Sequence, residues 1–157
     1  MSASPELQSE IRQEKPFASR EEEAFLALQR TAGLLALALG RELKTHELTP
    51  ALYNTLRILR GAAGEALTCG EIGERLVSPG PDVTRLLDRL EARGLIERLR
   101  DERDRRLVRA RITAAGEALL SHLDAPVAAA LRQLLGHLGE PKLKQLTALL
   151  AAARAKA

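Results

Sequence analysis

The sequence predicts a mainly α-helical fold that contains one small β-hairpin. Leucine and alanine dominate the apolar residues, whereas tryptophan is missing and the aromatic side chains are Phe17, Phe25 and Tyr53. Such a composition favours helices over a β-sandwich, whose strands are rich in aromatic and β-branched residues. Most segments repeat their apolar residues every three or four positions, and one short region alternates apolar and polar residues. A chain of 157 residues is long enough for one core with helical extensions.

The N-terminal part is expected to be a flexible arm followed by a long helix. Residues 1–20 are polar, contain Pro5 and Pro16, and show no sustained apolar period, so at most a frayed turn is expected there. From Glu21 three consecutive acids open a helix over 21–47, because they complement the helix dipole. Its apolar face consists of residues three or four positions apart: Phe25, Leu28, Ala32, Leu35, Leu39 and Leu43.

Two short helices are expected next. Thr49 can cap the free amides of a helix that begins at Pro50, where the proline ring is already set for helical geometry. This helix should end at Gly61. Thr68 and Glu71 have the spacing of a capping box, so a second helix is expected to begin between them.

A third helix is expected between Pro81 and Gly94, after a turn rich in proline and glycine. Its apolar residues form one stripe: Val83, Leu86, Leu87 and Leu90. At 100° per residue, Arg85 lies on the opposite face, flanked by Thr84 and Arg89. This helix therefore presents arginines outward.

A β-hairpin is expected after Gly94. Leu95–Arg100 forms its first strand and Leu107–Ile112 its second, in which apolar residues alternate with Arg109 and Arg111 as in a half-buried strand. The six charged residues 101–106 form the tip between the strands.

The C-terminal part, 114–157, is expected to consist of two helices. Thr113 can cap a long helix, in which Pro126 should produce a kink. Gly139-Glu140-Pro141 is expected to break the chain before a final helix. Both helices carry leucines at helical spacing: Leu119, Leu120, Leu123, Leu131, Leu135, Leu143, Leu146, Leu149 and Leu150.

Three helices followed by a hairpin make a winged helix-turn-helix over 48–113. A major groove about 12 Å wide accepts one helix, while a cationic hairpin can reach the neighbouring backbone or minor groove. From Gly80 to Arg111 there are ten arginines, seven acids and no lysine, and arginine suits bidentate contact with phosphates and guanine. The net charge of +3 also permits binding to a polyanion. The pattern therefore indicates double-stranded DNA as the partner.

Several motifs closely resemble the multiple antibiotic resistance regulator (MarR) family, and the likeness runs from about Glu21 to the C-terminus. The wing motif is the most specific, because generic helix-turn-helix proteins lack it. The motifs are Leu48-Thr49, Val83-Thr84-Arg85-Leu86-Leu87-Asp88-Arg89-Leu90, Gly94-Leu95-Ile96-Glu97-Arg98, and Asp104-Arg105-Arg106 seven residues before Thr113.

The resemblance implies a homodimeric, ligand-responsive repressor that binds a palindromic operator. Two chains would pair through the helix at 21–47 and the helices of 114–157. A small-molecule effector would shift the spacing of the two DNA-binding lobes, and we expect it between these helices and the helix from Pro50 to Arg60.

The resemblance also implies DNA contacts for particular residues. Thr84, Arg85 and Arg89 match positions on the recognition helix. In the wing, Arg106 matches the arginine that enters the minor groove and Asp104 the acid that orients it. The wing contributes the residues Arg103, Asp104, Arg105 and Arg106.

The turn before the recognition helix departs from the family pattern. Residues 78–82, Ser-Pro-Gly-Pro-Asp, are one residue longer than the usual turn. Proline cannot donate an amide and Asp82 would repel phosphate, so contacts from the start of this helix are in question.

The residues indicate neither an enzyme nor a metal or cofactor site. No nucleophile lies in a recognisable signature, and no glycine-rich loop cradles phosphate. The histidines, His46, His122 and His137, lack metal-ligand spacing. No membrane helix is expected, because the longest charge-free apolar run, Thr31–Gly40, is far shorter than the roughly 20 residues of a span. One cysteine and a start without an apolar signal segment favour the cytoplasm.

Two other functions stay open. The arginines could meet an acidic protein partner, which would make the domain a winged-helix interaction module. Cys69, near a predicted helix N-terminus, could make the protein a redox-sensing regulator, although a structural role is the simpler interpretation.

Overall fold

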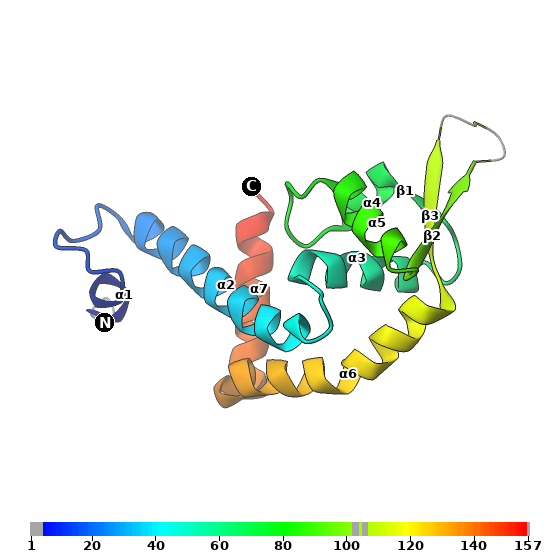
Figure 1. Ribbon diagram of the computed structural model, residues 1–157. Coiled ribbons are helices and arrows are strands. Elements are labelled where there is room, and N and C mark those ends of the chain that lie inside the picture. The colour runs from blue at the N-terminus through cyan, green and yellow to red at the C-terminus, as the bar shows by residue number, and fades with distance from the viewer. Residues whose placement is uncertain (1–4, 102–103, 105–106, 157) are drawn as a thin grey trace. The chain divides into compact units, whose positions relative to one another are not determined.

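The computed structural model describes residues 5–101, 104 and 107–156, and it is mainly helical with a small antiparallel sheet (Figure 1). The chain divides into two compact units between Ala38 and Leu39. The elements are α1 (Pro5–Glu10), α2 (Arg20–Lys44), α3 (Pro50–Gly61), β1 (Leu67–Thr68), α4 (Cys69–Arg75), α5 (Val83–Ala92), β2 (Ile96–Arg100), β3 (Val108–Ile112), α6 (Ala114–Leu135), the 3-10 turn η1 (Gly136–Leu138) and α7 (Gly139–Arg154).

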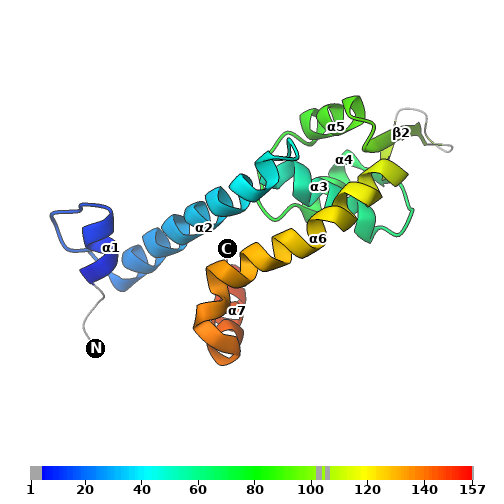
Figure 2. The same cartoon turned by 60° about the horizontal axis from the view of Figure 1, so that its bottom comes forward.

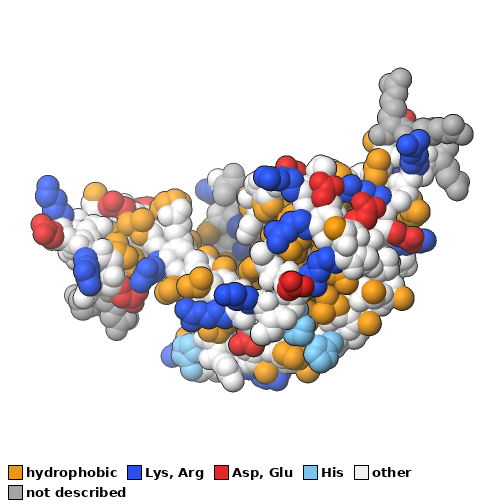
Figure 3. Space-filling view, viewed as in Figure 1, with side chains coloured by type: hydrophobic (Ala, Val, Ile, Leu, Met, Phe, Trp, Pro, Cys, Tyr) orange, Lys and Arg blue, Asp and Glu red, His pale blue; other side chains and the backbone are white. Residues whose placement is uncertain are grey.

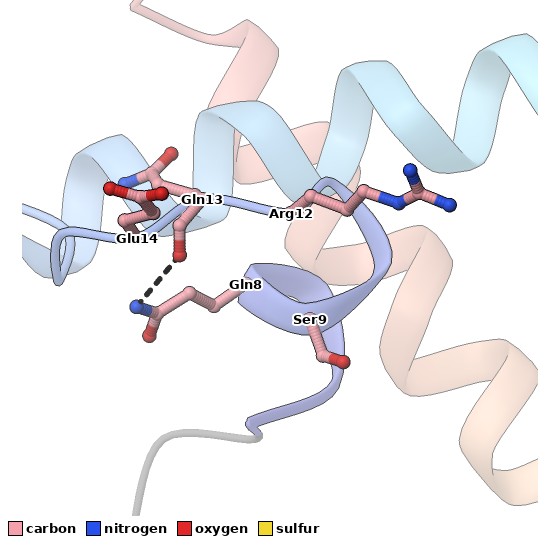
Figure 4. A pocket seen from close by; sticks show the side chains of 5 residues that line it. All are labelled: Gln8, Ser9, Arg12, Gln13 and Glu14. Atoms are coloured by element: carbon pink, nitrogen blue, oxygen red, sulfur yellow. Dashed lines mark hydrogen bonds between the residues drawn. The ribbon is translucent and has the colours of Figure 1, made fainter.

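The N-terminal unit contains a short helix that the sequence did not predict. Instead of at most a frayed turn, residues 5–10 form α1, in which Leu7 is 9% exposed. The Gln8 side-chain amide donates to the Gln13 carbonyl oxygen at 3.1 Å (Figure 4), so it links the helix to the segment that follows it. The expectation of at most a frayed turn is therefore wrong for residues 5–10, where one buried leucine and a local hydrogen bond accompany the helix. That residues 1–20 form a flexible arm stays a prediction.

Helix α2 confirms the predicted long helix, with slightly different ends. Its first turn carries Glu21, Glu22 and Glu23, and the Ser19 hydroxyl accepts from the Glu22 amide at 3.1 Å. Leu43 is its buried residue. In the single chain, large apolar side chains of the same helix are exposed: Phe25, Leu28, Leu34 and Leu37.

Helix α2 also has the length and apolarity of a helix that crosses a membrane. Its most apolar window of 18 residues has a mean hydropathy of 1.2, and none of that window is buried. The sequence predicted no such helix because charged residues interrupt the apolar run. A helix that packs against another protein surface meets the same criteria of length and composition.

The core of the unit from Leu39 onward is built around α3. Helices α4, α5 and α6 all contact α3, and in Figure 1 α4 and α5 lie above it and α6 below it. In Figure 2, where the bottom of that view comes forward, α6 passes in front of α3. The Thr49 hydroxyl accepts from the Leu52 amide at 3.3 Å, so the predicted cap of α3 is confirmed. The largest fully buried apolar side chains come from these four helices and from the end of α2: Leu43, Leu52, Leu56, Leu59, Ile72, Leu87, Leu90, Leu120 and Leu123.

The sheet has three strands in the order β1-β3-β2, where the sequence predicted two. Strand β1 pairs Leu67 with Ala110 and Thr68 with Arg109. Two residues are too few to show alternation, and Thr68 also forms the predicted capping box of α4 with Glu71. Strand β1 was not predicted because Thr68, its last residue, is also the N-cap of α4.

Helix α6 begins where the sequence predicted, but the break before α7 lies earlier than expected. Its chain continues through Pro126 to Leu135, and η1 follows. Gly139 (φ 74°) starts α7, so Pro141 lies in the first helical turn, where its missing amide is harmless. The predicted break is therefore confirmed at Gly139, whose φ of 74° is not helical, but it begins earlier, at Gly136–Leu138.

An ion pair joins α3 to α6. The two terminal nitrogens of Arg60 each donate to a carboxylate oxygen of Asp124 at 2.9 Å. These hydrogen bonds hold the pKa of Asp124 below its ordinary value. The pair therefore joins two helices that are 64 residues apart in sequence at this point.

The first turn of α6 packs against the backbone that follows α5. The Thr113 amide donates to the Leu95 carbonyl oxygen at 3.1 Å, and the Thr113 hydroxyl donates to the Gly94 carbonyl oxygen at 2.7 Å and accepts from the Gly116 amide. A Cβ added at Gly116 would collide with the Leu95 carbonyl oxygen and would lie 2.7 Å from Ile112. Only glycine therefore fits at this position.

We expect Gly116→Ala to lower the free energy of unfolding by about 1–3 kcal/mol, because the added methyl group meets backbone that cannot move aside. Chemical denaturation measures the change. Gly136→Ala is the matched control, because a Cβ there has nothing within 4 Å and the backbone φ is −64°. Equal stability of the two variants would contradict the close approach at Gly116.

Candidate nucleic-acid interface

Helix α5 is the candidate recognition helix. Leu86, Leu87 and Leu90 are buried, as the predicted apolar stripe requires. Thr84, Arg85 and Arg89 are exposed. Burial of one stripe fixes the rotation of the helix, so these side chains face away from the core.

The helix begins at Val83, two residues after the predicted start at Pro81. Asp82 is its N-cap, and its carboxylate accepts from the Arg85 amide at 3.3 Å. The side-chain carboxylate of an aspartate can accept a hydrogen bond from the free amides of the first turn, and the side chain of a proline cannot. The helix therefore begins after Asp82 and not at Pro81. The negative charge of Asp82 therefore occupies the helix N-terminus, where a phosphate could otherwise bind.

Most charged residues around α5 are already paired. Arg98 of β2 contacts Asp88 at 2.7 Å and Glu91 at 3.4 Å. Arg93 donates to the carbonyl oxygens of residues 46 and 47, in the loop between α2 and α3, at 2.9 and 3.0 Å. By contrast, the side chains of Arg85 and Arg89 make no hydrogen bond or ion pair within residues 5–101, 104 and 107–156.

The wing consists of β2, β3 and the connection between them. Five residue pairs join the strands, from Ile96 opposite Ile112 to Arg100 opposite Val108. Near the tip, the Asp104 amide donates to the Asp101 carboxylate at 2.9 Å. Arg103, Arg105 and Arg106, which the sequence assigned to DNA contact, lie outside the described residues, so the proposed orientation of Arg106 by Asp104 stays a prediction.

The arginines of β3 are held within the fold. Arg111 pairs with Glu97 opposite it on β2 at 2.6 Å. Arg109 donates to Asp101 and lies 3.4 Å from Glu71, and the hydrogen bond to Asp101 is the main cause of its raised pKa. These pairs brace the base of the wing against β2 and α4.

Val108 differs from the strand pattern that the sequence suggested. Ala110 and Ile112 are buried, but Val108 is 44% exposed. With Leu107 it lines a groove of about 630 Å³ beside α4 and α5. The other lining residues are Thr68, Cys69, Gly70, Thr84 and Arg98. Cys69 is a half-buried free cysteine at the start of α4.

The surface over α4 and α5 carries both signs of charge. Figure 3 shows basic and acidic side chains interspersed on this part of the domain. Attraction for a polyanion therefore depends on particular arginines more than on a uniform positive surface.

The histidines are closer together than their sequence spacing suggested. The rings of His46 and His122 meet edge to face, with centroids 5.5 Å apart. Among the residues whose placement is described, no group of three or more His, Cys, Asp or Glu side chains could hold a metal ion.

Sequence reasoning assigned no role to Arg93 or Arg98. Both belong to the arginine-rich segment, but their partners are 7 to 47 residues away in sequence. The alternation of residues along β2 could have indicated a structural role for Arg98, because it places Arg98 on the same face of the strand as the apolar Ile96.

Comparisons with known proteins agree on one family. A sequence model of the MarR family matches residues 46–107. The homoprotocatechuate degradative operon repressor of Escherichia coli is 31% identical over 107 residues, which are 68% of this chain and 71% of the repressor.

Solved structures give the same result. A MarR transcription factor from Planctomyces limnophilus is 38% identical with a TM-score of 0.67, and the match covers 87% of this chain and 99% of that one. A mutant of E. coli MarR in complex with operator DNA is 26% identical with a TM-score of 0.73, and the match covers 81% and 90% of the two chains.

Proposed function

Because the chain belongs to the MarR family of DNA-binding transcription regulators, we propose that it is a homodimer that represses transcription by binding a palindromic duplex. Members of this family regulate transcription and are not enzymes. The name of the E. coli repressor supports the negative sign of regulation. We propose that this chain acts in the cytoplasm, as is typical of the DNA-binding regulators of this family.

The proposal is supported above all by the exposure of Arg85 and Arg89 and by their lack of partners among the described residues. They lie exposed on a helix whose opposite stripe is buried, and neither side chain is engaged within the described part of the chain. Arginine in this position can bind guanine or phosphate through two parallel hydrogen bonds. Thr84, at the start of the same helix, would add a shorter contact.

The wing would make the second contact with the duplex. Its two paired strands project a connection that carries Arg103, Asp104, Arg105 and Arg106. We propose that Arg106 enters the minor groove and that Asp104 orients it. Two neighbouring contacts, one from α5 and one from the wing, would set the register of the domain on DNA.

The apolar faces of α2, α6 and α7 support the homodimer. None of residues 139–154, all of them described, is buried in the single chain, although α7 carries several leucines. An isolated amphipathic helix is marginal in water, so an uncovered apolar face favours a partner. Pairing two copies through these faces would place two recognition helices about 10 base pairs apart.

A small-molecule effector would act on this spacing. A ligand that prefers one separation of the two recognition helices shifts the population toward it, and the affinity for the operator changes by the same coupling. A compound that binds tightly and leaves operator affinity unchanged would not be such an effector.

Selection of bound duplexes from random DNA tests the function. We expect enrichment of an inverted repeat whose half-sites are about one helical turn apart, and binding that weakens as salt rises. Enrichment of a single half-site would contradict binding as a dimer. Binding to an acidic protein with no duplex enriched would instead favour the interaction module.

Arg85→Ala is expected to weaken binding to the selected duplex by roughly tenfold and to change the preferred base at one position in each half-site, because a base contact is lost. Competition with single-base variants of the duplex measures both effects. Arg132→Ala removes the same charge from the last turn of α6 and should leave base preference unchanged. A uniform loss across all sequences would make Arg85 a backbone contact.

Arg106→Ala is expected to weaken binding, because a minor-groove contact is lost, and to reduce the slope of log affinity against log salt by about one if the same side chain also neutralises a phosphate. Titration at several salt concentrations gives the slope. Arg106→Lys keeps the charge and should keep the slope. The role of Arg106 would be refuted by unchanged affinity and slope in the alanine variant.

Replacing Leu146 and Leu149 by glutamate should raise the dimer dissociation constant by at least roughly tenfold, because charges would enter an apolar interface. Sedimentation velocity measures the dissociation constant. Val77→Glu is the control, since Val77 is also apolar and 82% exposed but lies in the turn after α4. An undisturbed dimer in the double variant would exclude α7 from the interface.

A further inference from the structure

Arg98 of β2 contacts three residues of the recognition helix. Its Nη2 donates to the Thr84 carbonyl oxygen at 3.2 Å and to Asp88 Oδ1 at 2.7 Å, and its Nη1 lies 3.4 Å from Glu91 Oε2. Thr84, Asp88 and Glu91 are spaced by four and three residues, so they follow one side of the helix. One guanidinium group therefore holds α5 along about two turns.

The sheet explains how Arg98 reaches the helix. Ile96 and Arg98 share the inner face of β2, and Ile96 is 2% exposed within the core. The register partner of Arg98 is Ala110, which is fully buried and has a side chain of one carbon. Space beside this small residue lets the stem of Arg98 lie at the edge of the core, where 24% of its side chain stays exposed.

Arg98 also neutralises acids that share the helix with the DNA-contacting arginines. The side chains of Asp88 and Glu91 are 55% and 42% exposed. Without a cationic partner, both carboxylates would repel phosphates near Arg85 and Arg89. The planar guanidinium can meet two carboxylates and a carbonyl group at once, which the ammonium group of lysine does with less defined geometry.

We propose that Arg98 is a positioning residue for DNA recognition, which fixes the rotation of α5 relative to the wing. The inference rests on the proposed DNA-binding function. With α5 held on the strand that carries the wing, Arg85 and Arg89 face the base edges while the wing meets the adjacent backbone. Recognition groups must be held to within a fraction of an ångström, and a bond between the two contacting elements supplies that restraint.

The test compares each variant on the selected duplex and on a scrambled duplex of the same composition. The ratio of the two affinities measures sequence discrimination. Arg98→Ala should lower this ratio by about tenfold, and Arg98→Lys should restore part of it. Arg60→Ala is the matched control, because it removes a paired arginine whose partner, Asp124, lies on α6 and belongs to neither α5 nor the wing. Its ratio should stay within about twofold of the wild-type ratio.

A second set of variants removes the partner. Asp88→Ala should also lower the ratio, and the double variant Asp88→Ala with Arg98→Ala should lose no more than Arg98→Ala alone, because the two residues act through one contact. If circular dichroism shows that Arg98→Ala does not fold, the proposal is tested with Arg98→Lys and Asp88→Ala instead. Affinity ratios equal to the wild-type ratio in both variants would overturn it.

The outcomes separate this inference from the proposed function. If Arg98→Ala weakens both duplexes by the same factor, Arg98 contributes charge only and the positioning role is wrong. If the wild-type protein binds the selected and scrambled duplexes equally, the proposed sequence-specific function fails instead.

Discussion

The DNA-binding region depends on one close contact, made where the first turn of α6 meets the backbone that follows α5. Thr113 donates from its amide and its hydroxyl to two successive carbonyl oxygens, and Gly116 lets the helix approach them. The end of α5, the start of β2 and the end of β3 therefore meet at one point. Because backbone atoms cannot repack as side chains do, this junction holds the recognition helix and the wing at a defined separation.

Electrostatic pairing distinguishes the arginines around the recognition helix and the sheet. Several are held by carboxylates or carbonyl oxygens and maintain the arrangement of helices and strands: Arg60, Arg93, Arg98, Arg109 and Arg111. Arg85 and Arg89, by contrast, have no partner among the described residues. The net charge of +3 therefore does not show which arginines are available to contact DNA. The paired group keeps the acids of α5 and the wing from opposing a polyanion.

Features that depend on neighbouring residues could be predicted from the sequence. The caps at Thr49, Thr68 and Thr113 were predicted because a cap and its amide are three residues apart, and all three are observed. The apolar stripe of α5 was predicted by its period. The contacts of Arg98 could not be, because they depend on how β2 packs on α5, and nothing local to a strand specifies its partner. Strand β1 is too short to carry a pattern, and the start of α5 depended on the choice between Asp82 and Pro81.

The cap at Asp82 has a consequence for how such a protein would search a genome. A helix N-terminus usually attracts any phosphate, whatever the sequence, and so adds to the residence time on every stretch of DNA. Here a carboxylate occupies that end of α5. The helix would therefore hold non-target DNA weakly, leave it quickly and spend more of its time at sites where side chains further along the helix find their bases.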